Sequence, residues 1–142
     1  MSKTAHFWTV RDCGLGDVPA ILEFWQEATT PSATDTADDL CRAIGLPGTH
    51  VLVAEADGKI VGSVMGAFDG WRGNIYRLAV DPSCRRKGVA RDLVAQIEKR
   101  LAAAGARRIT ALVEKDHPWA VSFWEAVAYR QDARIVRHVR NL

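Results

Sequence analysis

The sequence predicts a mixed α/β fold, α+β in class, built on a mostly antiparallel sheet. Two observations support this prediction. Some segments alternate apolar and polar residues, which is the spacing of strands. Between them lie segments in which apolar residues recur about every three or four positions, which is the spacing of helices. The pair Asp57-Gly58 joins two apolar runs and suits the positive φ angles of a tight hairpin turn, so these two strands are expected to be antiparallel.

The length and charge of the chain limit its class. A chain of 142 residues, 48% of them hydrophobic, has the size and apolar content of one domain with one core. We therefore expect a single domain over residues 1–142. The formal net charge of +2, from 19 basic and 17 acidic residues, is too balanced for a protein whose main partner is a nucleic-acid backbone. Any function of basic residues is expected to be local.

Cysteine usage and hydropathy indicate the compartment. Cys13, Cys41 and Cys84 form no CxxC pair, and the four histidines show no metal-ligand spacing, which predicts reduced thiols and no metal. The first ten residues contain no apolar segment of signal-peptide length, and no run approaches the ~18 apolar residues of a membrane span. We expect a cytoplasmic protein that does not bind membranes.

The first half of the chain is predicted to contain a strand, two helices and the hairpin. Residues 6–12 have the pattern of a strand, and Asp17 is placed to cap the helix that follows. Thr36 and Asp39 form a capping-box pattern at the start of a second helix, which a Gly-Leu-Pro-Gly sequence ends. Residues 50–68 form the hairpin.

The second half is predicted to contain a strand over 74–80, a long helix, a strand over 107–114, a short helix and an edge strand in the tail at 131–142. Gly105 is the expected C-terminal cap of the long helix, and Pro118 opens the short one. Apolar residues mark one face of each helix: Val89, Leu93, Ile97 and Leu101 in the long helix, and Ala120, Phe123, Trp124 and Val127 in the short one.

Basic residues gather at the start of the long helix, where cations are electrostatically disfavoured. A helix N-terminus carries a partial positive charge and backbone N–H groups without partners. Gly88 and Ala90 let a ligand come close to this backbone, and successive N–H groups at a helix start form an anion site. The cations at this position are Arg85, Arg86, Lys87 and Arg91.

The anion predicted for this site is a pyrophosphate, because several cations would neutralise more than one phosphate charge. The Walker pattern is excluded since the chain has no GK[ST] sequence, and the dinucleotide pattern is excluded since Gly88 has no GxGxxG partners. The alternative is a solvated basic turn that binds nothing.

The motif Arg85-x-x-Gly88-x-Ala90, directly after the sequence LAVDP, resembles the acetyl-CoA pyrophosphate loop of the GNAT-type N-acetyltransferases. The resemblance covers nearly the whole chain, including the hairpin VAEADGKIVGSVMG and the late helix HPWAVSFWEAVAY. The turn DGWRG is similar to that of small single-domain bacterial members related to the acetyltransferases of ribosomal-protein N-termini. The resemblance implies splayed central strands, about four flanking helices, and a monomer or homodimer.

This resemblance also implies a reaction, in which the acetyl group of acetyl-CoA moves directly to a primary amine. The backbone N–H of Val80 would face the thioester carbonyl and stabilise the developing oxyanion. No side chain is needed for that role. The residues expected to contact acetyl-CoA are Leu78, Ala79, Val80, Arg85, Arg86, Lys87, Gly88, Val89, Ala90, Arg91, His117, Ala120, Phe123 and Trp124.

The late helix departs from the family pattern, which commonly runs Asn, Ala, Tyr-Glu and Gly-Phe. Trp124 stands where a tyrosine often protonates the leaving thiolate, and an indole N–H can only donate a hydrogen bond. A slow enzyme and a catalytically silent CoA binder are both consistent with this change. The corresponding residues in this chain are His117, Ala120, Trp124, Glu125, Ala128 and Tyr129.

The general base is not defined by the pattern, because Asn74 stands where some relatives carry a glutamate. Glu114 is one candidate, acting through a water molecule, and Tyr76 and His117 are others. His117 has two further possible roles, contact with the pantetheine arm or capping of the following helix.

The acceptor site is expected between the first two helices, their loop and the turns near Asp69 and Gln131. Acidic and aromatic side chains there suit a cationic amine. An amino acid, a polyamine, an antibiotic, a protein N-terminus and a lysine side chain all remain possible acceptors. The candidate residues are Trp25, Glu27, Asp35, Asp69, Trp71 and Arg72.

Two other classes of function remain open. A non-catalytic acyl-CoA sensor would keep the pyrophosphate loop and lose its acid and base groups. A nucleic-acid adaptor would use the basic residues of the tail, but these lack interleaved exposed aromatic residues, so we expect no nucleic-acid partner. The basic residues of the tail are Arg134, Arg137, His138 and Arg140.

Overall fold

A computed structural model describes residues 6–142, which fall into two compact units, Met1–Thr110 and Ala111–Leu142. The first unit holds the sheet and three of the helices. Its elements are β1 (Thr9–Asp12), a short 3-10 turn (Leu15–Asp17), α1 (Val18–Ala28), α2 (Ala37–Ile44), β2 (Thr49–Ala56), β3 (Lys59–Phe68), β4 (Gly73–Val80), a second 3-10 turn (Pro82–Cys84), α3 (Val89–Ala104) and β5 (Ile109–Ala111), which ends at the boundary.

The strands form one sheet in the order β1-β2-β3-β4-β5. The pairs β1–β2, β2–β3 and β3–β4 are all antiparallel, which confirms the mixed, mostly antiparallel fold class. The connection between β2 and β3 is the predicted tight turn, with Asp57 at φ 50° and Gly58 at φ 75°. Both φ angles belong to the left-handed region that two-residue hairpins require.

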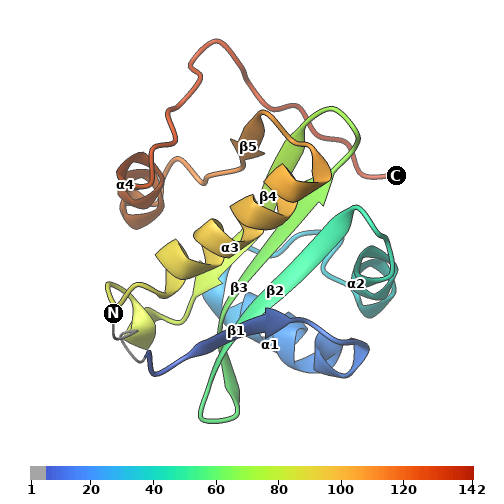
Figure 1. Cartoon of the computed structure of the whole chain (residues 1–142), viewed down its shortest axis with the longest axis vertical. Coiled ribbons are helices and arrows are strands. Elements are labelled where there is room, and N and C mark those ends of the chain that lie inside the picture. Colours follow the sequence, from blue (N-terminus) through green and yellow to red (C-terminus); the bar gives the residue numbers. More distant parts are fainter. Residues whose placement is uncertain (1–5) are drawn as a thin grey trace. The chain divides into compact units, whose positions relative to one another are not determined.

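Helix α3 packs closely on one face of the sheet (Figure 1). Its four predicted core residues, spaced by four from Val89 to Leu101, are at most 1% exposed. Gly62 and Gly66 of β3 lie beneath it. A Cβ at Gly66 would lie 2.5 Å from Cγ1 of Ile97, so only glycine permits this separation of helix and strand.

Helices α1 and α2 cover the opposite face, where the side chains of alternate strand residues point. Ile21, Trp25 and Leu40 are at most 2% exposed and pack with Val51 and Val53 of β2. At the start of α2 the Thr36 hydroxyl accepts a hydrogen bond from the Asp39 N–H at 3.1 Å, which confirms the predicted cap.

The prediction for Asp17 is wrong in its detail. Asp17 directly precedes α1, but its side chain makes no capping hydrogen bond to that helix. Its carboxylate instead binds the Arg11 guanidinium, at 2.7 and 2.9 Å, and the Gly14 N–H at 2.7 Å. These contacts, with Arg11 first, lower the pKa of Asp17 to about 2. A charged partner outcompetes a cap because charge-assisted hydrogen bonds are the stronger ones.

Several predicted strands are shorter or missing. The first begins at Thr9 instead of His6, and the one expected over 107–114 contains only Ile109–Ala111. The expected edge strand over 131–142 is wrong, since residues 130–142 contain no strand. The tail does not alternate as a strand requires: Ile135 and Val136 are adjacent, and both are exposed.

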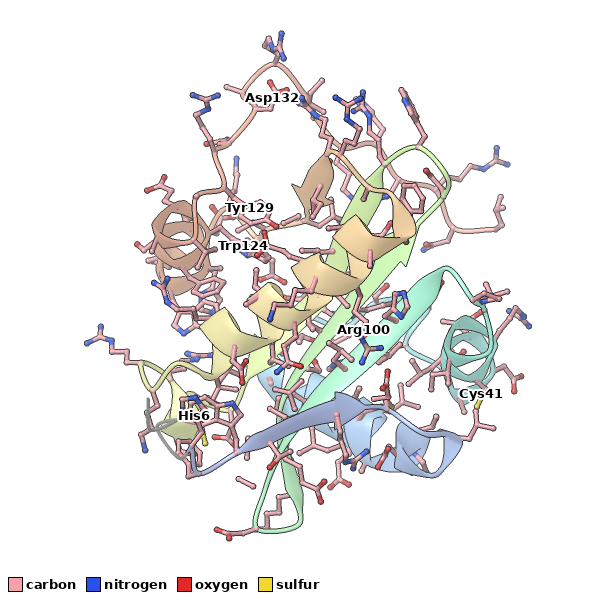
Figure 2. The ribbon with its side chains drawn as sticks, viewed as in Figure 1. His6, Cys41, Arg100, Trp124, Tyr129 and Asp132 are labelled. Atoms are coloured by element: carbon pink, nitrogen blue, oxygen red, sulfur yellow. The ribbon has the colours of Figure 1, made fainter. Side chains whose placement is uncertain are left out.

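The second unit is organised by α4 (Pro118–Ala126), which begins at the predicted proline. The helix ends in a Schellman motif, in which the Tyr129 N–H donates to Trp124 O at 2.9 Å and the Ala128 N–H donates to Glu125 O at 3.1 Å. Ala128 takes the left-handed conformation, with φ 73°, where glycine is usual. The motif brings the rings of Trp124 and Tyr129 to 4.8 Å between centroids (Figure 2).

Gly105 ends α3 in the left-handed region, with φ 115°, and this confirms it as the predicted terminator.

Within residues 6–142, no helix combines the length and the apolar character that a bilayer crossing requires. The expectation of one domain over residues 1–142 stays a prediction.

The contact between β3 and α3 yields a prediction for stability. Gly66→Ala places a methyl group against Ile97 and should lower the free energy of unfolding by ~1–3 kcal/mol, because overpacked cores must shift. Gly16→Ala is the matched control, since nothing lies within 4 Å of its Cβ position. Thermal unfolding followed by circular dichroism measures both. Equal melting temperatures for the two variants would contradict the proposed close packing.

Candidate functional site

The loop between β4 and α3 begins with a rigid turn. Asp81 accepts hydrogen bonds from the Ser83 hydroxyl at 2.7 Å and from the Ser83 N–H at 2.9 Å. These two bonds, the hydroxyl first, lower the pKa of the Asp81 carboxyl below its ordinary value. Farther along the loop, Arg86 and Gly88 both have positive φ angles, 64° and 99°. The chain therefore makes two left-handed steps just before the helix.

The second of these steps leads directly into the first turn of α3. Gly88 is the N-cap residue, and the Asp92 N–H donates to Gly88 O at 3.0 Å. The N–H groups of Val89, Ala90 and Arg91 precede that bond, and they belong to the part of any α-helix that has no intrahelical acceptor. Glycine contributes no side-chain cap, so these donors are available to an anion.

Basic side chains surround this helix start. Arg86, Lys87 and Arg91 are exposed and Arg85 is half-buried, with its Nε atom shielded from solvent. The structure thus brings together four predicted cations and the N–H groups of one helical turn. Chemically, this combination favours a ligand with more than one negative charge.

An aromatic segment supports the helix start, and the sequence reasoning missed its role. The Trp8 indole donates to the Asp92 carboxylate at 2.9 Å, and the Trp8 ring lies 3.5 Å from the position of a Cβ at Gly88. The ring of Phe7 lies 5.5 Å from the Lys87 ammonium. No local signal in the sequence connects residues 7 and 8 to a loop 80 residues later, because only the folded chain brings them together.

The end of β4 directs a backbone donor away from its neighbouring strand. Asp81 N–H donates to Val61 O of β3 at 2.8 Å, and Val80 pairs with Gly62. Because N–H groups alternate in direction along an antiparallel strand, the Val80 N–H points away from β3. Strand β5 approaches the opposite end of β4 from Val80. There the N–H of Gly73, the first residue of β4, donates to Arg108 O at 2.9 Å.

A β-bulge precedes this donor. Ser63 of β3 pairs with Ala79 and Met65 pairs with Tyr76, so Arg77 and Leu78 together face the single residue Val64. Arg77 has φ 55°, a left-handed value that is uncommon for a residue other than glycine. The bulge re-aims Leu78, Ala79 and Val80, the three strand residues predicted to contact a cofactor. The bulge could not be predicted from the sequence, because Arg77 has no turn-forming character.

Three of the predicted acceptor residues, Trp25, Asp35 and Asp69, contact other groups of the protein. Trp25 is 2% exposed and lies in the core beside Arg77, which also binds Asp35. Asp69 bonds to the backbone of its own turn, accepting from the N–H groups of Trp71 and Arg72 at 2.8 Å each. The bonds from Arg72, then Trp71, lower the pKa of Asp69.

Two candidate residues keep exposed surfaces. Trp71 is 74% exposed, with the guanidinium of Arg72 lying 4.3 Å from its ring centroid, and Glu27 is exposed on α1. The candidate base Tyr76 is half-buried on β4, as is Asn74, which stands where some relatives carry a glutamate. Both side chains point to the opposite face from buried Ile75.

The remaining candidates lie in the second unit. Glu114 is exposed, and His117 is the N-cap residue of α4, although its side chain makes no capping hydrogen bond. The Nδ1 atom of His117 is buried and has no hydrogen-bond partner among residues 6–142. Trp124 is 6% exposed and contacts the ring of Phe123 at 5.4 Å, besides that of Tyr129. Tyr129 therefore adds a phenol near Trp124 that sequence reasoning had not considered.

Comparison with known proteins identifies the class to which this fold and loop belong. The profile of the Acetyltransferase (GNAT) family matches residues 18–129, which extend from α1 through α4. The chain belongs to this family.

Curated relatives agree with the family. An acetyltransferase of Pectobacterium atrosepticum is 35% identical over 114 residues, which are 80% of this chain and 81% of that one. An acetyltransferase of Yersinia pestis is 40% identical over 102 residues, 72% of each chain.

Two solved structures share the fold. The aminoglycoside 6'-N-acetyltransferase AAC(6')-Ig of Acinetobacter haemolyticus superposes with a TM-score of 0.79 at 14% identity, over 94% of this chain and 99% of that chain. The aminoglycoside N-acetyltransferase AAC(6')-Iy, solved in complex with CoA, also gives 0.79, at 16% identity over 100% and 99%.

Proposed function

We propose that the protein transfers the acetyl group of acetyl-CoA directly to a primary amine. The observation that carries this proposal is the start of α3, where a left-handed glycine, the first N–H groups of the helix and four cations lie together, an arrangement that suits a pyrophosphate. Family membership supports acetyl transfer, and the CoA complex of a structural neighbour supports the same cosubstrate.

In this proposal the first unit supplies the electrostatic part of catalysis. The pyrophosphate occupies the loop from Arg85 to Arg91, and the pantetheine arm runs along Leu78, Ala79 and Val80. The Val80 N–H, which points away from β3, donates to the thioester oxygen as negative charge develops on it. Loss of such a donor typically costs about a hundredfold or more in rate.

The reaction itself requires two proton transfers. The amine nitrogen attacks the carbonyl carbon, the C–S bond breaks, and the products are an N-acetylated amine and CoA. The attacking nitrogen loses a proton to a base, for which Glu114, Tyr76 and His117 remain the candidates. We propose that Trp124 donates a hydrogen bond to the departing thiolate, which then takes up a proton from water. A thiol with a pKa near 8.5 is already a fair leaving group.

We propose a small cationic molecule as acceptor. Solved neighbours of the same fold are aminoglycoside acetyltransferases, one of them in complex with sisomicin, which favours a small amine over a protein N-terminus or lysine. Exposed Glu27 and Trp71 can contribute charge and ring surface to such an amine. The protein is further proposed to act in the cytoplasm, as a monomer or homodimer with a single domain over residues 1–142 and without a metal or a nucleic-acid partner.

A second candidate function follows from Trp124. With no titrating group at the position that often carries the acid, an acyl-CoA sensor without turnover is also consistent with the site. Acetyl-CoA consumption in a broad screen of amines distinguishes the two functions, because a sensor binds acetyl-CoA without consuming it.

The first test concerns Gly88. Gly88→Asp should weaken acetyl-CoA binding by well over tenfold, because its carboxylate occupies the phosphate site and repels the ligand. Gly88→Asn is the matched control, since it has nearly the same shape, no charge, and tolerance of the left-handed φ of 99°. Calorimetry measures both affinities. Equal losses in the two variants would assign the effect to backbone strain and contradict a phosphate site.

A second test separates phosphate contacts from packing. Arg85→Ala and Lys87→Ala should each weaken CoA by about tenfold and leave pantetheine, which has no phosphate groups, nearly unchanged. The reason is that the lost charges act on the phosphates. Calorimetric titration with both ligands gives the comparison. Equal losses for CoA and pantetheine would show that these residues maintain the loop structure only.

The third test addresses Trp124. Trp124→Tyr restores a hydroxyl able to protonate the thiolate, so kcat with a good amine acceptor should rise or stay level. Trp124→Ala should lower kcat by opening a cavity next to the pantetheine arm. Ser122→Ala, at an exposed position of the same helix, is the control. Full activity and unaltered acetyl-CoA binding in Trp124→Ala would mean that residue 124 is not at the sulfur.

A further inference from the structure

The β-bulge in β4 is tied to the segment between α1 and α2 by the side chain of the residue that forms it. Arg77 is left-handed and lies at the turning point of the bulge. Its Nη1 atom donates to the Thr29 hydroxyl and to Thr30 O, both at 3.0 Å. Its Nη2 atom forms an ion pair with the carboxylate of Asp35. One guanidinium therefore holds both ends of a segment that has no regular secondary structure over most of its length.

A second set of contacts fixes the backbone of the same residue. The Ser63 hydroxyl donates to Arg77 O at 2.9 Å and accepts from the Trp25 indole at 2.8 Å. Ser63 is fully buried, so both of its hydrogen-bonding roles are filled inside the protein. The Trp25 ring also lies 5.3 Å from the guanidinium carbon of Arg77. The bulge is thus held from beneath by Trp25 and Ser63, and its side chain holds the segment in turn.

The location of the ion pair sets it apart from the surface pairs of this protein. The side chains of Arg77 and Asp35 are each only 18% exposed, whereas those of Arg42 and Asp39, paired on α2, are 70% and 40% exposed. Shielded charges are screened less by salt and solvent, and a planar guanidinium that donates to three oxygen atoms holds its partners in one geometry.

We propose that Arg77 is a positioning residue that sets the acceptor segment, residues 29–36, relative to the strand end that carries the Val80 N–H. This inference rests on the proposed function. The same residue forms the bulge and binds Thr29, Thr30 and Asp35. A movement of the segment away from Arg77 would therefore also change its distance from the thioester beside Val80. Asp35 then acts on the amine through Arg77, with its charge already paired, and not as the direct counter-ion of the amine.

The chemical consequence concerns the approach of the amine. Direct transfer needs the nitrogen within about 3–3.5 Å of the carbonyl carbon, and a misplacement of about 1 Å can cost a hundredfold in rate. The acetyl-CoA loop at α3 contains none of the atoms bound by Arg77. Loss of the guanidinium should therefore affect the amine and leave the affinity for acetyl-CoA largely intact.

The test uses Arg77→Gly, since glycine adopts φ 55° without strain and so keeps the bulge while removing the side chain. Hydrogen–deuterium exchange over residues 29–36 should become at least about tenfold faster. With sisomicin, spermidine and a peptide bearing a free N-terminus as probe amines, kcat/KM for the amine should fall by about a hundredfold, mainly through kcat, because the bound amine is misplaced. The Kd for acetyl-CoA should change by less than about threefold.

Two further variants test the geometry of the contact. Arg77→Lys keeps the charge but not the planar fork, so it should recover only part of the loss. Arg42→Gln breaks the exposed pair on α2 and should match the wild type in exchange and in kinetics. A merely structural role for Arg77 would weaken acetyl-CoA and the amine alike, and that result would overturn the inference.

The remaining outcomes separate this inference from the function on which it rests. A wild-type protein that neither binds acetyl-CoA nor acetylates any probe amine overturns both. An active wild type that Arg77→Gly matches in kcat/KM for the amine and in exchange overturns the inference alone. If the wild type binds acetyl-CoA but acetylates none of the three amines, exchange decides: faster exchange over 29–36 supports the inference, and unchanged exchange overturns it.

Discussion

The close approach of α3 to β3 is the constraint on which the first unit depends. Gly62 and Gly66 expose bare backbone beneath the helix, and a Cβ at Gly62 would lie 3.0 Å from both Val89 and Leu93. Because Val89 is the first residue of the helix, this contact also determines where α3 begins. The same packing that closes the core therefore fixes the direction of the N–H groups that precede the first intrahelical bond. The proposed anion site is then a consequence of core packing, with cations added around it.

Two arginines with left-handed backbone conformations flank the end of β4 in the first unit. Arg77 before it and Arg86 after it both have left-handed φ angles that cost free energy in residues with a side chain. Such conformations persist only where neighbouring groups hold them, and the bonds of Ser63, Thr29 and Asp35 to Arg77 supply that constraint. A site built from backbone requires such a fixed strand end, and here it directs the Val80 N–H away from β3.

The parts of this fold that were predictable from sequence are those with a local cause. The hairpin followed from the φ preference of Asp57-Gly58, and the core face of α3 followed from a spacing of four. Gly105 and Thr36 act as the expected helix ends. In each case the residue determines the backbone within a few positions of itself, so no knowledge of tertiary structure was needed.

What could not be predicted depends on contacts between distant residues. Asp17 was expected to cap a helix, but Arg11, placed beside it by the start of the sheet, binds the carboxylate instead. The tail was expected to be a strand, although its apolar residues lack the alternation of one. The bulge had no local signal at all, because a left-handed arginine is stable only when Ser63 and the α1–α2 segment are already in place. Roles of this kind become visible only after the chain has folded.

In the function proposed here, the difference between backbone groups and side chains explains how acetyl transfer can tolerate the change at Trp124. A backbone N–H is present whatever the side chain, so substitution along LAVDP would leave the oxyanion donor of Val80 in place as long as β4 keeps its bulge. A general acid is a side chain, and one substitution removes it. Its loss costs about a hundred- to ten-thousandfold, but less where the leaving group is a thiolate of moderate basicity. The chemistry therefore depends more on the geometry of β4 than on residue 124, and the residues that hold this geometry, Ser63, Arg77 and Asp35, are where substitution should be least tolerated.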